Sequence, residues 1–143
     1  MTGIIVVGVD GSGTALKAAE TARDLAVSLG ATLHVVSAFD SDRTEVFGSG
    51  SDKWIVSDAG NAEKVARSVA DSLRTSSLNV TYAAARGKPA EALVAEATRS
   101  GAQLIVVGNR RMQGLGRVLG SVANSVAHSA PCDVYIAKTD AAD

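Results

Sequence analysis

Short aliphatic runs of strand length alternate along this chain with longer segments in which apolar residues recur at helical spacing. Such an alternation predicts repeated β-α-β units, and these units form a parallel sheet with helices packed on its faces. The pattern predicts five strands, at residues 4–9, 32–39, 80–85, 104–108 and 134–138. The sequence therefore predicts an α/β fold with three layers, in which a doubly wound five-stranded parallel sheet carries helices on both faces.

Four helices are expected between these strands, and two of them have clear boundary signals. The first helix follows the turn at residues 10–13 and stops at Gly30, and the third begins at Pro89 and stops at Gly101. The second covers residues 58–76, and the last runs through residues 122–128. Residues 4–9 and 104–108 are nearly pure aliphatic runs, which is typical of central strands buried on both faces.

One segment, residues 40–57, departs from this pattern, because it is a long polar stretch rich in Gly, Ser and Asp that also holds Trp54. Long connections of this kind in compact domains are often functional. We expect Trp54 to plug the edge of the sheet, while a lid over a ligand is the alternative. Since 143 residues with 46% hydrophobic content fill one core, the chain is expected to form a single domain over residues 1–143, with a disordered tail at about 140–143.

Charge and cysteine content argue against several classes of protein. The chain carries 14 basic and 15 acidic residues, so no overall positive field favours nucleic acid or an anionic membrane surface. No apolar run approaches the roughly 20 residues of a membrane span, and we expect a cytoplasmic protein. Cys132 is the only cysteine and is interpreted as an inert packed thiol, and no tightly bound metal is expected. His34 and His128 have no evident acid, base or nucleophile partner in the sequence and are interpreted as structural.

In open parallel sheets a ligand binds beyond the carboxyl ends of the strands, where the strand order reverses. The strands at 4–9 and 104–108 both end in glycine-containing loops that lead into helices, so their loops are expected to border one cleft. Asp10 ends the first strand, where it either accepts hydrogen bonds from a ligand, helps to hold a metal or caps the following helix. Gly120 and Ser121 open the last helix, where free amides and the helix dipole favour a phosphate. A helix cap with nothing bound is the alternative for this pair.

Catalytic motifs are absent from the sequence. There is no P-loop, no nucleophile elbow, and no third glycine of the dinucleotide fingerprint after the turn at Gly11. Three arginines, Arg110, Arg111 and Arg117, lie close enough to the predicted cleft to bind phosphate, although an arginine-rich loop is also typical of a solvated surface. A binding protein is therefore favoured over an enzyme, with a slow ATPase at most.

Several short segments resemble the universal stress protein family, and they occur in the family's order over nearly the whole chain. They are Val7-Gly8-Val9-Asp10-Gly11-Ser12, Leu33-His34-Val35-Val36, Gly87-Lys88-Pro89-Ala90-Glu91-Ala92-Leu93, and Val106-Val107-Gly108-Asn109 through Leu119-Gly120-Ser121-Val122 to Ala130-Pro131-Cys132-Asp133-Val134. The resemblance implies a Rossmann-like fold of the adenine nucleotide alpha-hydrolase type with strand order 3-2-1-4-5. It also implies a stress-response regulator that binds ATP, AMP or cyclic AMP, with or without magnesium.

The family resemblance also assigns roles to residues. It places Asp10 near the ribose and backbone groups around Val35 at the adenine edge, and it implies nucleotide-binding positions at Val9, Asp10, Val35, Gly108, Asn109, Arg110, Gly120, Ser121 and Val122. Arg111 stands where nucleotide-binding relatives have a second glycine, and the stretch to Gly120 is one residue shorter than their pattern. Family members typically dimerise through the last strand, Val134 to Lys138 here. The alternative function is a dimeric interaction protein that acts through protein partners without nucleotide.

Overall fold

The computed structural model describes residues 3–40, 44–47, 54–109 and 119–139. Its main feature is a parallel sheet of five strands in the order β5-β2-β1-β6-β7. The strands are β1 (Ile4–Gly8), β2 (Thr32–Phe39), β5 (Val80–Arg86), β6 (Leu104–Asn109) and β7 (Asp133–Lys138). Counted among these five, the order is 3-2-1-4-5, so the fold class and strand order predicted from the sequence are confirmed, and the two aliphatic strands β1 and β6 are neighbours at the centre.

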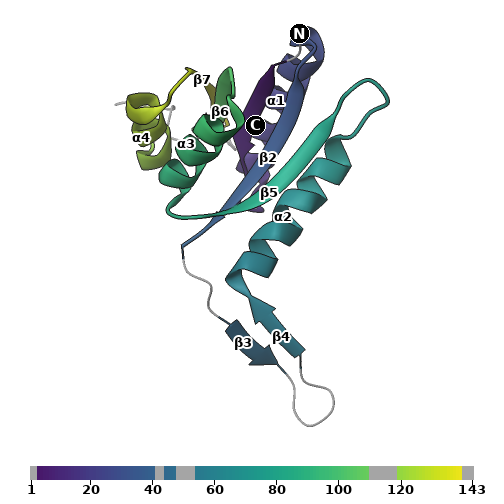
Figure 1. Cartoon of the computed structure of the whole chain (residues 1–143), viewed down its shortest axis with the longest axis vertical. Helices are drawn as coiled ribbons and strands as arrows, with labels where there is room; N and C mark the ends of the chain where they lie inside the picture. The colour runs from purple at the N-terminus through teal and green to yellow at the C-terminus, as the bar shows by residue number, and fades with distance from the viewer. Residues whose placement is uncertain (1–2, 41–43, 48–53, 110–118, 140–143) are drawn as a thin grey trace.

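The helices cover both faces of this sheet (Figure 1). α1 (Gly13–Leu29) and α2 (Asp58–Leu73) pack on one face, and α3 (Pro89–Ser100) and α4 (Ser121–Ser129) pack on the other. α1 and α3 end at Gly30 and Gly101 as predicted. α2 is shorter than predicted, because the chain leaves the helix after Leu73 and forms a tight bridge between Thr75 and Leu78 before β5.

Two apolar clusters, one on each side of the sheet, form the core. Alternate residues of β1 contribute to both, since Ile5 and Val7 pack under α1 and α2 while Val6 packs under α3 and α4. All three are completely buried. This two-sided burial explains why the central strands show no polar alternation in the sequence.

Residues 44–57 differ from the predicted polar loop, because β3 (Thr44–Phe47) and β4 (Trp54–Ser57) pair as an antiparallel hairpin. The hairpin lies beyond the start of α2 and away from the five-stranded sheet (Figure 1). Phe47 and Trp54 face each other in the pairing register. The side chains of this hairpin lie outside the described part of the structure, and so does the choice between a lid and an edge plug for Trp54. Residues 140–143, predicted to be a disordered tail, are outside it as well.

Candidate functional site

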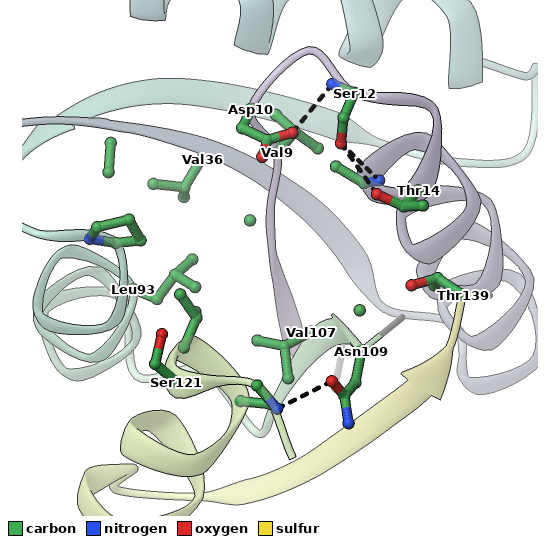
Figure 2. A pocket seen from close by; sticks show the side chains of 18 residues that line it. Val9, Asp10, Ser12, Thr14, Val36, Leu93, Val107, Asn109, Ser121 and Thr139 are labelled. Carbon is green, nitrogen blue, oxygen red and sulfur yellow. Dashed lines mark hydrogen bonds between the residues drawn. The ribbon is translucent and has the colours of Figure 1, made fainter. Parts of the chain in front are cut away.

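A cavity of about 460 Å³ lies at the carboxyl edge of the sheet, above the junction of β1 and β6 (Figure 2). The chain leaves β1 toward one edge of the sheet and β6 toward the other, so the cavity occupies the switch point of the topology. Its volume falls in the range of small-molecule sites. The lining residues are Gly8, Val9, Asp10, Ser12, Thr14, Ala15, Val36, Ala38, Pro89, Leu93, Val107, Gly108, Asn109, Gly120, Ser121, Val122, Ala123 and Thr139.

One wall of the cavity is apolar. It consists of Val36 and Ala38 from β2 together with Pro89 and Leu93 from α3. Val36 and Leu93 are almost completely buried, and Figure 2 shows them on the side of the cavity opposite Thr139. The backbone of this wall is fixed to β1, because the N–H of Val9 donates to the carbonyl of Val36 at 2.9 Å. Such a wall suits a flat, weakly polar ring.

The turn between β1 and α1 forms the upper rim of the cavity. The Asp10 carboxylate accepts the backbone N–H of Ser12 at 2.9 Å, and the Ser12 hydroxyl accepts the N–H of Ala15 at 3.1 Å. Ser12 is therefore the N-cap of α1, and the suggestion that Asp10 caps this helix is wrong. The carboxylate remains exposed at the rim, where it can accept further hydrogen bonds.

The first turn of α4 forms the opposite rim. Gly120 occupies the N-cap position, and since it has no side chain, no side-chain hydrogen bond caps the helix. The N–H of Gly120 donates instead to Oδ1 of Asn109 at 3.0 Å, which anchors the helix start to the end of β6 (Figure 2). The next residues, Ser121 and Val122, line the cavity. An uncapped helix N-terminus presents N–H groups and the positive end of the helix dipole, which together favour an anion.

The cavity is lined by all but two of the site residues predicted from the sequence. The residues that line it are Val9, Asp10, Gly108, Asn109, Gly120, Ser121 and Val122. Arg110 lies outside the described residues, as do Arg111 and Arg117. Ser121 is the first helical residue rather than the cap, so its exposed hydroxyl does not satisfy the helix end.

Val35 is the exception among the described residues. Its side chain is completely buried in the core under α1 and α2, and it does not line the cavity. Successive side chains of a strand point to opposite faces, so Val36 and Ala38 form the cavity wall in its place. The side chain of Val35 therefore lies outside the site, and the prediction that backbone groups around Val35 bind the adenine edge stays a prediction.

Several lining residues were missed in the sequence analysis. Leu93 was not assigned to the site, although it follows Pro89 by one helical turn and so shares its end of the helix. Thr14 lies in the first turn of α1, and its hydroxyl pairs with that of Ser12 at 3.1 Å. Thr139 follows β7 directly before the predicted tail, and no motif marked it.

His34 has an acidic partner that the sequence did not suggest. Its Nε2 lies 2.8 Å from Oε2 of Glu96, and its Nδ1 lies 2.7 Å from the hydroxyl of Thr81. Arg99 donates through both Nε and Nη2 to the same carboxylate, and this pairing lowers the pKa of Glu96 although burial opposes the shift. None of these side chains lines the cavity. The group links β2, β5 and α3, and the interpretation of His34 as structural stays a prediction.

Three further findings concern metal ions, membrane spans and the cysteine. Among the described residues, no group of three or more His, Cys, Asp or Glu side chains is arranged to hold a metal ion. Within those same ranges, no helix combines the length and apolar character of a membrane span. Cys132 is partly buried, and burial raises the pKa of its thiol, with the carboxylate of Asp133 acting in the same direction.

A doubly wound parallel sheet with a cavity at its switch point defines an α/β protein of the Rossmann-like class. Within this class, the family model described as the Universal stress protein family matches residues 1–138, and the chain belongs to that family.

Solved structures support the same assignment. A structure described as a universal stress protein in complex with cAMP is 28% identical, with a TM-score of 0.72 and coverage of 96% of this chain and 98% of that one. A universal stress protein from Archaeoglobus fulgidus is 26% identical, with a TM-score of 0.70 and coverage of 95% and 93%. Protein Rv1636 from Mycobacterium tuberculosis H37Rv is 28% identical, with a TM-score of 0.59 and coverage of 96% and 95%. No curated protein matches the chain.

Proposed function

We propose that this protein is a cytoplasmic stress-response regulator that binds an adenine nucleotide, ATP, AMP or cyclic AMP, as a homodimer and without robust catalysis. The observation that carries the proposal is the polarity of the cavity: an apolar wall on β2 and α3 and the uncapped N-terminus of α4 line the same cavity. A nucleotide matches both features, because its adenine ring is flat and weakly polar, its phosphate is an anion, and the ribose joins the two.

The adenine would lie against Val36 and Leu93, where burial of its faces removes apolar surface from water. The phosphate would lie at Gly120 and Ser121, where amides of the first turn of α4 supply hydrogen bonds and the dipole supplies a favourable field. Asp10 lies at the rim formed by the β1–α1 turn and can accept hydrogen bonds from ribose hydroxyls. The 28% identical relative described in complex with cAMP supports an adenine nucleotide as the ligand.

We expect a magnesium ion to bind only together with the nucleotide. Asp10 is the one charged side chain among the described lining residues, and it is anionic. A polyphosphate close to this carboxylate would gain from a divalent cation between the two negative groups. Binding of ATP is therefore expected to be tighter with magnesium than without it.

The dimer would form along β7. This strand is an edge of the sheet, and its Tyr135 is 43% exposed. An uncovered edge strand with an exposed aromatic side chain is a ready surface for pairing. Analytical ultracentrifugation of the wild type and of Tyr135→Asp is the test, and an unchanged sedimentation coefficient would reject this interface.

Isothermal titration calorimetry with ATP, AMP and cyclic AMP, each with and without magnesium, tests nucleotide binding. At least one nucleotide is expected to bind with a dissociation constant in the micromolar range or below. The absence of measurable heat for all of them at high micromolar protein would reject the function.

The competing function is a dimeric interaction protein that needs no nucleotide, and the arginine at position 111 favours it, because nucleotide-binding relatives have glycine there. Gly120→Glu separates the two. A Cβ at Gly120 would lie 3.2 Å from Oδ1 of Asn109, and the added carboxylate would repel a phosphate. This variant should lose the nucleotide-linked rise in melting temperature, whereas Ser125→Glu, which adds the same charge to an exposed position of α4, should keep it. Gly120→Glu protein that keeps all activity in cells would support the interaction protein.

A further inference from the structure

Thr139 is a buried polar residue at the polar end of the cavity. It is 2% exposed and lines the cavity, and Figure 2 shows its hydroxyl oxygen directed toward the interior. Its backbone is fixed, because its N–H donates to the carbonyl of Asn109 at 3.4 Å and so extends the β6–β7 pairing by one residue. Within the described part of the chain, its hydroxyl has no hydrogen-bond partner.

A buried hydroxyl without a partner destabilises a protein unless water or a ligand satisfies it. Apolar packing alone would be served equally well by valine, which has the same shape. The unsatisfied hydroxyl therefore indicates a polar group that enters the cavity at this point.

Thr139 lies on the opposite face of the sheet from the phosphate position at α4. Ala137 belongs to the core under α1, and alternation along the strand direction places Thr139 on that same face. Val107 belongs to the core under α3 and α4, so Asn109 and the Gly120 that it binds lie on the other face. A phosphate bound at the N-terminus of α4 therefore does not contact the Thr139 hydroxyl.

Gly108 lies on the sheet edge between these two positions. A Cβ at Gly108 would lie 3.1 Å from both Cγ2 and Oγ1 of Thr139 and 3.3 Å from Cβ of Ala18. Because Gly108 has no side chain, the space beside the Thr139 hydroxyl at the carboxyl end of β6 stays open. On the far side, Thr14 and the first turn of α1 complete a polar border, and α1 also points its N-terminus toward the cavity.

We propose that the cavity has a second anion position, formed by the Thr139 hydroxyl and the first turn of α1, which receives the distal phosphates of a nucleotide. The inference rests on the proposed function and deepens it. In this arrangement the α-phosphate of the nucleotide lies at the start of α4. The phosphate chain then passes over Gly108 at the carboxyl end of β6, and the next phosphates contact Thr139. The site is thereby selective for nucleoside diphosphates and triphosphates over monophosphates, and Thr139 is the specificity-determining residue.

Thr139→Val tests the proposal, because it removes the hydroxyl and keeps the shape. Calorimetric dissociation constants for ATP, ADP, AMP and adenosine are measured with and without magnesium on the full chain. The affinities for ATP and ADP are expected to fall about tenfold, as for a lost hydrogen bond to a charged group, while those for AMP and adenosine stay unchanged. Thr139→Ser keeps the hydroxyl and is expected to restore the preference.

The melting temperature of the ligand-free protein separates a binding role from a structural one. Since the hydroxyl is unsatisfied without ligand, Thr139→Val is expected to melt at the same temperature as the wild type or higher. Thr21→Val is the matched control, because its hydroxyl bonds the carbonyl of Lys17 in α1 outside the cavity lining, and it should leave all four affinities unchanged. Thr139→Ala replaces the valine variant if the latter does not fold.

Three results would overturn the second anion position. They are equal affinities of wild type and Thr139→Val for ATP, an equal loss for ATP and adenosine, and a lower melting temperature of the ligand-free variant. In each case nucleotide binding by the wild type would stand. Wild-type protein that binds none of the four ligands and no cyclic AMP would reject the proposed function itself.

Discussion

Oδ1 of Asn109 accepts the backbone N–H of Gly120 at 3.0 Å, and this bond joins the end of β6 to the start of α4 across eleven positions of sequence. Asn109 is 3% exposed, so water does not compete for the bond. The contact fixes the uncapped first turn of α4 relative to the central strands. The position of the proposed anion site therefore depends on a side chain that needs no contact with the proposed ligand.

Replacing Asn109 by Ala should destabilise the protein and weaken phosphate binding together. Loss of the acceptor leaves a partly buried N–H unsatisfied, which costs about 1–3 kcal/mol of the free energy of unfolding. The affinity for AMP should fall more than that for adenosine, because the helix start is no longer fixed. Urea denaturation and calorimetry measure the two effects, and a variant that loses stability but binds AMP normally would contradict the anchoring role.

Asn109→Asp separates geometry from charge. The aspartate keeps an oxygen for the Gly120 N–H but adds a negative charge next to the proposed phosphate position. AMP affinity is expected to fall about tenfold, since like charges at short range repel by more than 1 kcal/mol in a partly dry site. Adenosine affinity, measured by the same titration, should change little. Equal losses for AMP and adenosine would place the phosphate elsewhere.

The turn at Gly11 can be tested through backbone strain alone. Gly11 has φ of 88°, and a Cβ there would meet only Val65 atoms at 3.8 Å or more, so space does not oppose a side chain. Gly11→Ala should therefore lower the free energy of unfolding by about 1 kcal/mol, the usual cost of a left-handed conformation. Gly13→Ala is the control, because it has helical geometry and open space around it. Equal stability of Gly11→Ala and the wild type would show that the turn relaxes.

The parallel sheet and the cleft beside its two central strands could be predicted because they depend on patterns within short segments, whereas the full strand order and most site residues were implied by the family resemblance. Aliphatic runs marked β1 and β6, and the glycine at 120 marked the helix start beside them. The face of β2 that borders the cavity could not be predicted, since a strand buried on both sides shows no polar alternation. The resemblance implied only backbone groups around Val35, whereas the side chain that lines the cavity is that of Val36.

Contacts between distant segments were equally hidden. His34 and Glu96 are separated by 62 positions, and nothing in either local pattern indicates that β2 and α3 bring them within 2.8 Å. Thr139 meets Gly108 only because β7 pairs with β6. The hairpin of β3 and β4 was missed because its two strands have four residues each, within a stretch dominated by Gly, Ser and Asp.

The network at Glu96 predicts how stability depends on pH. Arg99 and His34 hold the pKa of this carboxyl below 4.5, its ordinary value, although burial opposes the shift. A group whose pKa is lower in the folded state stabilises the fold above the pKa of the unfolded chain, and this contribution is lost as pH falls through the folded-state pKa. Glu96→Gln should therefore be less stable than the wild type at pH 7, by about 1 kcal/mol for a lost charged hydrogen bond. The difference in free energy of unfolding, measured by urea denaturation at several pH values, should shrink below pH 4.5 as the wild-type carboxyl takes up its proton.

Asp71→Asn is the control, because its pairing with Arg74 is exposed and should contribute little at any pH. A difference between Glu96→Gln and the wild type that stays constant down to pH 3 would show that packing, and not charge, makes Glu96 important to the fold.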